Sequence, residues 1–328
     1  MDIELRGISK RFGTVQANQD ISLDIRAGEV LGLLGENGAG KSTLMNILSG
    51  LYSADSGDIL IDGKPVTFTG PGDSIASGIG MVHQHFMLVP VFSVVENVIL
   101  GVEPTTGADF LDLAAARAQV QDINTRYGMQ VPTDALIEDL PVGIQQRVEI
   151  LKVLFRSADV LILDEPTAVL TPQEVEEFFT IVRALRDAGK GIVFITHKLH
   201  EILEIADRVS VLRQGQIVGQ GDPATFSEAD LAEMMVGRPV SFSVGRRDAA
   251  PGDAVLQLAG VSLFDGPQDA RLVDINLQVH GGEVVGIAGV QGNGQTELVE
   301  AITGLSAVTT GKVGFAGQDI TRASVRQR

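Results

Sequence analysis

A glycine-rich loop between a buried strand and a helix constrains the fold of this chain more than any other feature. Residues 35–42 read Gly-Glu-Asn-Gly-Ala-Gly-Lys-Ser, which fits the pattern G-x-x-x-x-G-K-[ST]. Val30–Leu34 before the loop is the apolar run of a buried strand, and Thr43–Leu48 after it continues as an amphipathic helix that ends near Gly50. This order of strand, loop and helix predicts an α/β fold built around a phosphate-binding loop.

The chemistry of the loop predicts a site for a nucleoside triphosphate. Glycines allow successive backbone N–H groups to surround the phosphates, and the helix that follows points its positive dipole end at the same anion. Lys41 is expected to reach the β- and γ-phosphates, and the Ser42 hydroxyl to coordinate Mg²⁺. A glycine-rich turn that binds nothing is the alternative, and the complete context disfavours it. The expected binding residues are Gly35, Glu36, Asn37, Gly38, Ala39, Gly40, Lys41, Ser42 and Thr43.

A second loop with the same frame begins at Gly289, 254 residues after Gly35, and reads Gly-Val-Gln-Gly-Asn-Gly-Gln-Thr. Gln295 therefore stands where the first loop has Lys41. Other pairs recur at the same separation: Gly28-Glu29 with Gly282-Glu283, Gly57 with Gly311, Gly63 with Gly317, and Ile21–Ile25 with Ile275–Val279. We infer a duplication whose second loop has lost its main phosphate-binding charge; its residues are Gly289, Gly292, Gly294, Gln295 and Thr296.

The repeat sets the expected domain boundaries. Residues 1–237 form the first copy, 238–253 a polar linker with Pro, Gly and a basic pair, and 254–328 the first part of the second copy. In the first copy, the stretch beyond the equivalent point supplies the rest of the central sheet. A parallel sheet that stops there leaves strand edges and an apolar face uncovered. The sequence therefore reads as C-terminally truncated.

Size and charge narrow the function classes. A length of 328 residues favours two domains, and the net charge of −17 argues against nucleic acid as the main partner. The chain has no cysteine, which excludes a disulfide framework and fits a reducing compartment. The acidic start Met1–Glu4 does not resemble a signal peptide, and no apolar run approaches the roughly 20 residues that span a bilayer. A membrane role therefore requires a separate membrane partner.

Two further apolar runs end in groups suited to phosphate chemistry. Val160–Leu163 is followed by Asp164, which is expected to hold Mg²⁺ through water, and by Glu165, which is expected to act as general base. Ile192–Thr196 ends at His197, which could bond the γ-phosphate and position Glu165. A solvated acidic turn and a structural histidine are the alternatives. We interpret the other histidines, His83, His85 and His200, as surface residues or as residues that support the site without touching the ligand. No group of His, Cys and carboxylate residues has the spacing of a transition-metal site.

Together these residues resemble the ATP-binding subunit of an ATP-binding cassette (ABC) transporter, over essentially the whole chain. The first loop and Asp164-Glu165 match the Walker A and Walker B motifs of that family. Gln84 matches the Q-loop glutamine, which contacts Mg²⁺ and signals to the membrane subunit, and His197 matches the switch histidine. Phe12 matches the aromatic that stacks on adenine; a plain hairpin apolar residue is the alternative. The resemblance implies the catalytic residues Lys41, Glu165 and His197 and the Mg²⁺ ligands Ser42, Gln84 and Asp164.

The resemblance extends to the signature motif, which opens a helix and binds the γ-phosphate held by the opposite cassette. The matching residues are Leu140, Pro141, Val142, Gly143, Ile144 and Gln145. Pro141 replaces the usual serine; it suits the first position of a helix but offers a phosphate neither a hydroxyl nor an N–H. The usual aspartate of the D-loop is also replaced, by Thr171. Because sites are shared in this family, Gln295 is expected to face Pro141, and the Lys41 site needs a second half-cassette or a second copy. The resemblance therefore implies that this length binds ATP but hydrolyses it poorly.

Tandem cassettes with a degraded second loop resemble the importers of simple sugars and nucleosides. The segments 83–90 and 164–174 resemble the same subgroup. Within it, Pro141 and the sequence of the second loop favour the nucleoside importers. This implies a P-loop NTPase fold with a mixed or parallel central sheet and a helical subdomain at about 88–155 that docks a membrane-subunit coupling helix. The implied partners are integral-membrane permease subunits and a substrate-binding protein, with this chain peripheral on the cytoplasmic face of the cell membrane. Sugar import of the ribose or galactose type, and a soluble protein acting on ribosomes or DNA, are the alternatives.

Overall fold

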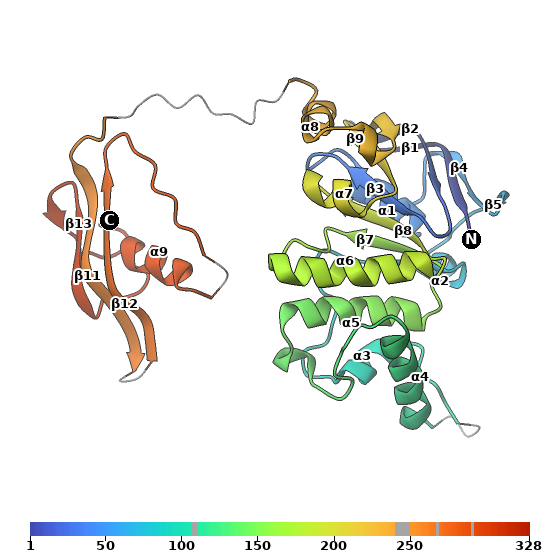
Figure 1. Cartoon of the computed structure of the whole chain (residues 1–328), viewed down its shortest axis with the longest axis horizontal. Coiled ribbons are helices and arrows are strands. Elements are labelled where there is room, and N and C mark those ends of the chain that lie inside the picture. Colours follow the sequence, from blue (N-terminus) through green and yellow to red (C-terminus); the bar gives the residue numbers. More distant parts are fainter. Residues whose placement is uncertain (107–109, 240–249, 267–268, 290–291) are drawn as a thin grey trace. The chain divides into compact units, whose positions relative to one another are not determined.

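The computed structural model describes residues 1–106, 110–239, 250–266, 269–289 and 292–328. The chain divides into two compact units, residues 1–241 and 242–328, which are described separately (Figure 1). Most of the expected linker 238–253, and Val290 and Gln291 of the second loop, lie outside the described residues.

A six-stranded sheet forms the centre of unit 1. Its strands, in spatial order, are β10 (Gln216–Gly221), β9 (Arg208–Arg213), β3 (Val30–Leu34), β8 (Gly191–Thr196), β7 (Val160–Asp164) and β6 (Ile79–Val82). The strands from β9 to β6 run parallel, and β10 pairs with β9 in the antiparallel sense. All residues of β3 and β8 are buried, as apolar runs in the middle of a parallel sheet should be. The mixed central sheet expected from the sequence is confirmed.

A second, antiparallel sheet of unit 1 covers the phosphate-loop helix. Its strands lie in the order β2 (Val15–Ile25), β1 (Ile3–Phe12), β4 (Ser56–Ile61) and β5 (Lys64–Val66). Helix α1 (Lys41–Leu48) buries Leu44, Met45 and Leu48 in one cluster with residues of both sheets. The helix that follows the first loop is therefore held from two sides, which fixes the direction of its N-terminus.

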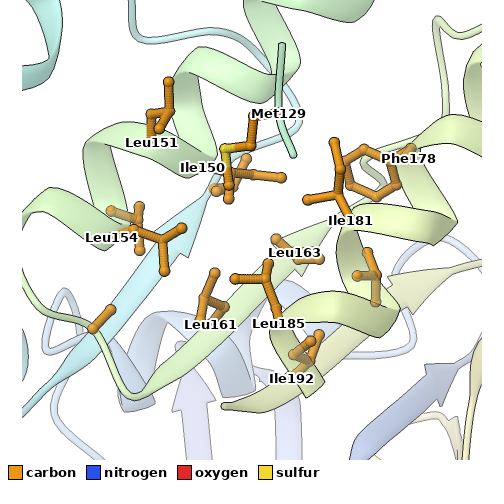
Figure 2. Close-up of a cluster of buried hydrophobic side chains, with 14 of the residues drawn as sticks. Met129, Ile150, Leu151, Leu154, Leu161, Leu163, Phe178, Ile181, Leu185 and Ile192 are labelled. Atoms are coloured by element: carbon orange, nitrogen blue, oxygen red, sulfur yellow. The ribbon is translucent and has the colours of Figure 1, made fainter. Parts of the chain in front are cut away.

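Helices predominate between residues 88 and 155. This segment contains α3 (Val94–Ile99), α4 (Leu113–Arg126), the short η1 (Ile137–Asp139) and α5 (Val142–Phe155), and α6 (Pro172–Asp187) runs beside α5 (Figure 1). Figure 2 shows the core that joins them to the sheet: Ile150 and Leu154 of α5 face Leu161 and Leu163 of β7, with Phe178 of α6 beside them. The remaining helices of unit 1 are α2 (Pro71–Ala76), α7 (Leu199–Ile205), η2 (Pro223–Thr225) and α8 (Glu228–Val236).

Unit 2 contains a sheet built like the antiparallel sheet of unit 1. Its order is β12 (Asp269–His280), β11 (Ala254–Gly266), β13 (Thr310–Phe315) and β14 (Gln318–Asp319), with helix α9 at Gln295–Thr303. A Cβ at Gly57 would lie 2.5 Å from the carbonyl oxygen of Gly7, and a Cβ at Gly311 would lie 2.3 Å from that of Gly260. The same glycine-on-glycine approach therefore lets the strands cross closely in both sheets.

Unit 2 differs from unit 1 just before its phosphate loop. Residues 283–289 correspond to β3 but form no strand, and Val284 is 99% exposed. In unit 1, β3 is hydrogen-bonded between β8 and β9. Among the described residues of unit 2, the strands pair only in the order β12-β11-β13-β14, and none lies beside 283–289. An apolar run alone does not make a strand; it needs neighbours that satisfy its backbone groups.

Truncating Phe178 tests the core that fastens the helices to the sheet. The Phe178 side chain is 1% exposed and its ring centroid lies 6.5 Å from that of Phe194. We expect Phe178→Ala to lower the free energy of unfolding by about 3–5 kcal/mol, measured by urea denaturation followed by circular dichroism. Phe110→Ala is the matched control, because the Phe110 side chain is 72% exposed. Equal stability of the two variants would contradict this description of the core.

Candidate active site

The first phosphate loop closes around its own lysine. Lys41 is the first residue of α1 and is 6% exposed; its Nζ donates to the carbonyl oxygens of Gly35 (2.6 Å) and Glu36 (3.1 Å). Gly40, the N-cap of α1, has φ 106°. A Cβ at Gly40 would lie 2.3 Å from the carbonyl oxygen of Ala17, so this position requires glycine for both its backbone angle and its space.

Most of the residues expected to bind the nucleotide line one cavity of about 680 Å³. Gly35, Glu36 and Ala39 are not in its lining; Gly35 and Ala39 are buried in the loop and Glu36 is exposed. The expected residues that do line the cavity are Phe12, Asn37, Gly38, Gly40, Lys41, Ser42, Thr43, Gln84, Asp164 and Glu165.

Three groups expected to act together meet at Glu165, directly after β7. The Gln84 amide donates to Oε2 of Glu165 (3.2 Å), and Nδ1 of His197 lies 3.0 Å from its Oε1. The three residues follow β6, β7 and β8, which are neighbours in the parallel sheet, so their carboxyl ends reach the same edge. Glu165 has φ 46°, a left-handed conformation that is uncommon for residues other than glycine.

Three side chains, those of Lys41, Asp164 and Glu165, place one positive and two negative charges close together in the cavity. Burial lowers the pKa of Lys41, and the nearby charges of Glu165 and Asp164 act against that shift. Burial and the neighbouring Glu165 raise the pKa of Asp164, against the opposing effect of Lys41 and His83. The two carboxylates therefore repel each other in a partly desolvated place, and a bound cation would relieve that repulsion.

The donor atoms fit Mg²⁺. Ser42 offers a hydroxyl, Asp164 a carboxylate and Gln84 an amide oxygen, and all three residues line the cavity. Hard oxygen donors of this kind suit Mg²⁺ rather than a soft transition metal. Across the described ranges of the chain, no group of three or more His, Cys, Asp or Glu side chains is placed to hold a metal on its own.

Phe12 presents an aromatic face at the cavity. Its side chain is 44% exposed, and its ring packs edge-on against Tyr52 with centroids 5.3 Å apart. The Lys10 ammonium lies 5.5 Å from the centre of the same ring. The ring is thus supported on one side and open on another, which is the arrangement that base stacking requires.

The structure does not bring the signature residues to this cavity. Residues 140–145 lie at the start of α5, and none of them belongs to the cavity lining. Pro141 is the N-cap of α5, with φ −55° and ψ 150°, so the helix begins at Val142. Pro141 therefore lies one residue before the helical position expected for it, because its extended ψ cannot continue into a helical turn.

The threonine in place of the usual D-loop aspartate has a structural role. Thr171 is the N-cap of α6: its hydroxyl accepts from the N–H of Glu174, whose carboxylate bonds the Thr171 backbone in return. Threonine and aspartate both suit this position. The histidines set aside in the sequence lie elsewhere: His85 and His200 are exposed, and His83 lines a different cavity.

Four residues of the cavity wall were not expected from the sequence. Val15, Gln16 and Ala17 come from the start of β2, and Gln214 from the turn between β9 and β10. The N–H of Gly215 donates to the carbonyl oxygen of Ala39 (2.9 Å), which ties that turn to the phosphate loop. The Gln214-Gly215 turn has the composition of a hairpin, but its place beside the loop depends on long-range strand pairing.

The second loop resembles the first in its backbone conformation where its helix begins, but its side chains carry different charges. Gly294, the N-cap of α9, has φ 93°, close to that of Gly40. The Gln295 side chain folds back over Gly289, as Lys41 does over Gly35, but it is neutral. Nearby, Arg271 pairs with three carboxylates, those of Asp265, Glu297 and Glu300. The described part of this loop therefore offers a phosphate much less positive charge.

Comparison with known proteins agrees with this geometry. A family model for ABC transporters matches residues 18–168 and 272–328, which is more than half of the chain. The chain belongs to the ABC transporter family. The matched segments of this ABC-family chain include both phosphate loops.

The relatives of this ABC-family chain are named as import proteins. It is 48% identical to a nucleoside import ATP-binding protein, NupA, of Lactococcus lactis subsp. cremoris and to a guanosine import ATP-binding protein, NupO, of Bacillus subtilis, in each case over 99% of this chain and 64% of the relative. It is 44% identical to a ribose import ATP-binding protein, RbsA 1, of Streptomyces avermitilis, over 98% of this chain and 60% of the relative. The chain thus spans less than two thirds of the length of these relatives.

Solved structures show the same fold. The chain resembles cbiO1 of Clostridium perfringens, part of the ABC transporter complex cbiONQ, with a TM-score of 0.61 and 31% identity over 70% of this chain and 92% of that one. It also resembles an ABC transporter cassette in its ADP conformation, with a TM-score of 0.62 and 25% identity over 72% of this chain and 95% of that one. The P-loop NTPase fold expected from the sequence is confirmed.

The raised pKa of Asp164 predicts a pH-dependent stability cost. Because Asp164 holds its proton more tightly in the folded chain, stability falls as the pH rises from its unfolded pKa, about 3.9, through its folded pKa. We expect Asp164→Asn to raise the melting temperature of the nucleotide-free protein at pH 7, by about 2–4 °C for each kcal/mol relieved, and the gain to shrink towards pH 4. The measurement is thermal unfolding of both proteins across that range, with Asp122→Asn, an exposed carboxylate of α4, as control. A gain that persists unchanged at pH 4 would contradict the assignment to Asp164 ionisation.

Proposed function

We propose that this chain binds and hydrolyses ATP, with Mg²⁺, as the energy-coupling subunit of an importer, and that the imported solute is a nucleoside. The observation that carries the proposal is the single cavity where Lys41, Asp164 and Glu165 meet, with Gln84 and His197 hydrogen-bonded to Glu165. The 48% identity to two proteins named for nucleoside and guanosine import supports the choice of solute.

Each residue has a defined task in the proposed reaction. Adenine stacks on Phe12, loop N–H groups hold the β- and γ-phosphates, and Lys41 adds its positive charge. Ser42, Asp164 and Gln84 would hold Mg²⁺, which when bound would neutralise charge on the phosphates. Glu165 accepts a proton from the water that attacks the γ-phosphorus, as the bond from that phosphorus to the bridging oxygen breaks. His197 orients the Glu165 carboxylate through the 3.0 Å contact.

A second cavity supports a membrane partner. It measures about 240 Å³ and lies between α2, β6 and α5. Three large apolar side chains of its wall are exposed, those of Leu51, Ile75 and Met87, and apolar surface around a hollow is typical of protein contact sites. We assign this cavity to a helix of an integral-membrane permease, which works with a substrate-binding protein. The chain would then act on the cytoplasmic face of the membrane; no helix within the described residues is long and apolar enough to cross it.

Sugar import is the second candidate for the solute. The 44% identity to a ribose import protein is only slightly lower than the identities to the nucleoside import proteins. The residues that line the ATP cavity would be the same in both cases, because the solute is selected elsewhere in such a system.

ATP binding should depend on the first loop alone. We expect isothermal titration of the 328-residue chain with ATP and Mg²⁺ to give roughly one nucleotide per chain. Lys41→Ala should abolish this binding, because it removes the main charge facing the phosphates, whereas Glu165→Gln should retain it. Lys64→Ala, which removes an exposed lysine of β5, is the matched control. Undiminished binding by Lys41→Ala would refute the site.

The solute can be tested by uptake in cells that carry the Glu165→Gln gene in place of their own. General base loss typically slows a reaction by about 10²–10⁴-fold, so uptake of labelled guanosine should fall close to background while ribose uptake is unchanged. Glu176→Gln, an exposed carboxylate of α6, is the control. Loss of ribose uptake with normal guanosine uptake would assign the chain to sugar import; loss of neither would refute the transport role.

A further inference from the structure

The segment His83–Val89, here called the Q-loop segment, connects β6 to the helical part of unit 1 and contains no regular secondary structure. Its backbone groups therefore have no ladder or helix partners, and any that are shielded from water need other partners. At Met87 and Val89 both the N–H and the carbonyl are bonded by side chains. Those of Val89 pair with Asn97 of α3, and those of Met87 with two residues of α5.

The two residues of α5 are Glu149 and Lys152. The N–H of Met87 donates to the Glu149 carboxylate, and Nζ of Lys152 donates to the carbonyl oxygen of Met87 (2.9 Å). The same two side chains form an ion pair at 3.2 Å. Glu149 and Lys152 thus bind each other and also bind the N–H and the carbonyl group of Met87. We call this arrangement the Glu149–Lys152 clamp.

The burial of the clamp shows that it is more than a surface ion pair. Glu149 is 4% exposed, and Lys152 is partly buried. Exposed ion pairs contribute little, but a buried carboxylate is costly unless every acceptor site is used. The Met87 side chain, in contrast, is 62% exposed, so it is the backbone of Met87 and not its side chain that is fastened to α5.

The clamp joins the Q-loop segment, which carries Gln84, to helix α5, whose start carries the expected signature residues. Gln84, three residues before Met87, reaches Glu165 at 3.2 Å. Glu149 lies seven residues, or about two turns, after Val142, so it shares a helix face with the start of α5. Three residues span at most about 10 Å, so fixing Met87 limits the region in which Gln84 can lie.

We propose that Glu149 and Lys152 are positioning residues, which hold both backbone groups of Met87 against α5 and thereby fix where the Gln84 amide lies beside Glu165. The inference rests on the proposed role of Gln84 at bound nucleotide. Glu149 and Lys152 also line the cavity that we assign to a membrane partner, so a partner helix seated there contacts the clamp directly.

Hydrogen exchange of the nucleotide-free chain tests the clamp itself. The Met87 amide should exchange at least about tenfold faster in Glu149→Ala than in the unmodified protein, because its acceptor is lost. Glu149→Gln keeps an acceptor oxygen and should restore most of the protection. Asp122→Ala, which removes an exposed carboxylate of α4, should leave Met87 unchanged. An unchanged Met87 amide in Glu149→Ala would overturn the proposal.

The effect on Gln84 is tested by ATP affinity with and without Mg²⁺. Glu149→Ala and Gln84→Ala should each reduce the gain in affinity that Mg²⁺ provides by a similar factor, and the double variant should lose no more than either alone. ATP affinity in EDTA should stay unchanged, because the Lys41 loop is intact; a general loss of structure would lower it. Lys152→Met serves as the second variant if Glu149→Ala does not fold. Additive losses in the double variant would overturn the proposal. So would a Glu149→Ala protein whose ATP affinity rises with Mg²⁺ as much as that of the unmodified chain.

Failure of the unmodified chain to bind ATP would instead refute the proposed function. The exchange rate of the Met87 amide would still show whether the clamp holds the Q-loop segment.

Discussion

The site depends on a buried ammonium group that faces two carboxylates across the edge of a parallel sheet. Lys41 is desolvated, and the cost of its charge is offset by the carbonyl oxygens of Gly35 and Glu36 and by Asp164 and Glu165. This balance requires β3 and β7 to lie at a fixed separation, with β8 between them. The hydrophobic core that fastens α5 and α6 to β7 and β8 therefore serves the site directly, because a shift of β7 would leave opposite charges buried and apart.

Much of this arrangement could be predicted from local sequence, and the rest depends on topology. The strand, loop and helix around Lys41 follow from an apolar run, three loop glycines and an amphipathic pattern, all within 20 residues. The place of His197 beside Glu165 was expected from the ends of two apolar runs, whereas the place of Gln84 in the site rested on family resemblance. The strand order β8-β7-β6 is what brings the three positions together. Gln214 was missed for the same reason, because its turn reaches the loop only through the pairing of β9 with β3.

The two phosphate loops show how much a loop depends on its surroundings. Gly40 and Gly294 have similar backbone angles, and both begin a helix. Around Lys41, a sheet supplies two carboxylates, a glutamine and a histidine; near Gln295, the described residues supply Arg271 with three acidic partners. Within the described residues, no strand lies beside 283–289, whereas β3 lies between β8 and β9. A motif match therefore locates a loop, and the strands beside it decide what the loop can bind.

Photolabelling with azido-adenine ATP, followed by peptide mapping, tests the central claim most directly, because it reports which loop holds the nucleotide. The label should fall on the peptide that carries Phe12, which lines the cavity of the first loop. An excess of unlabelled ATP should prevent the labelling. Labelling that falls instead on residues 254–328, or that unlabelled ATP does not displace, would contradict the assignment of the nucleotide to the Lys41 loop.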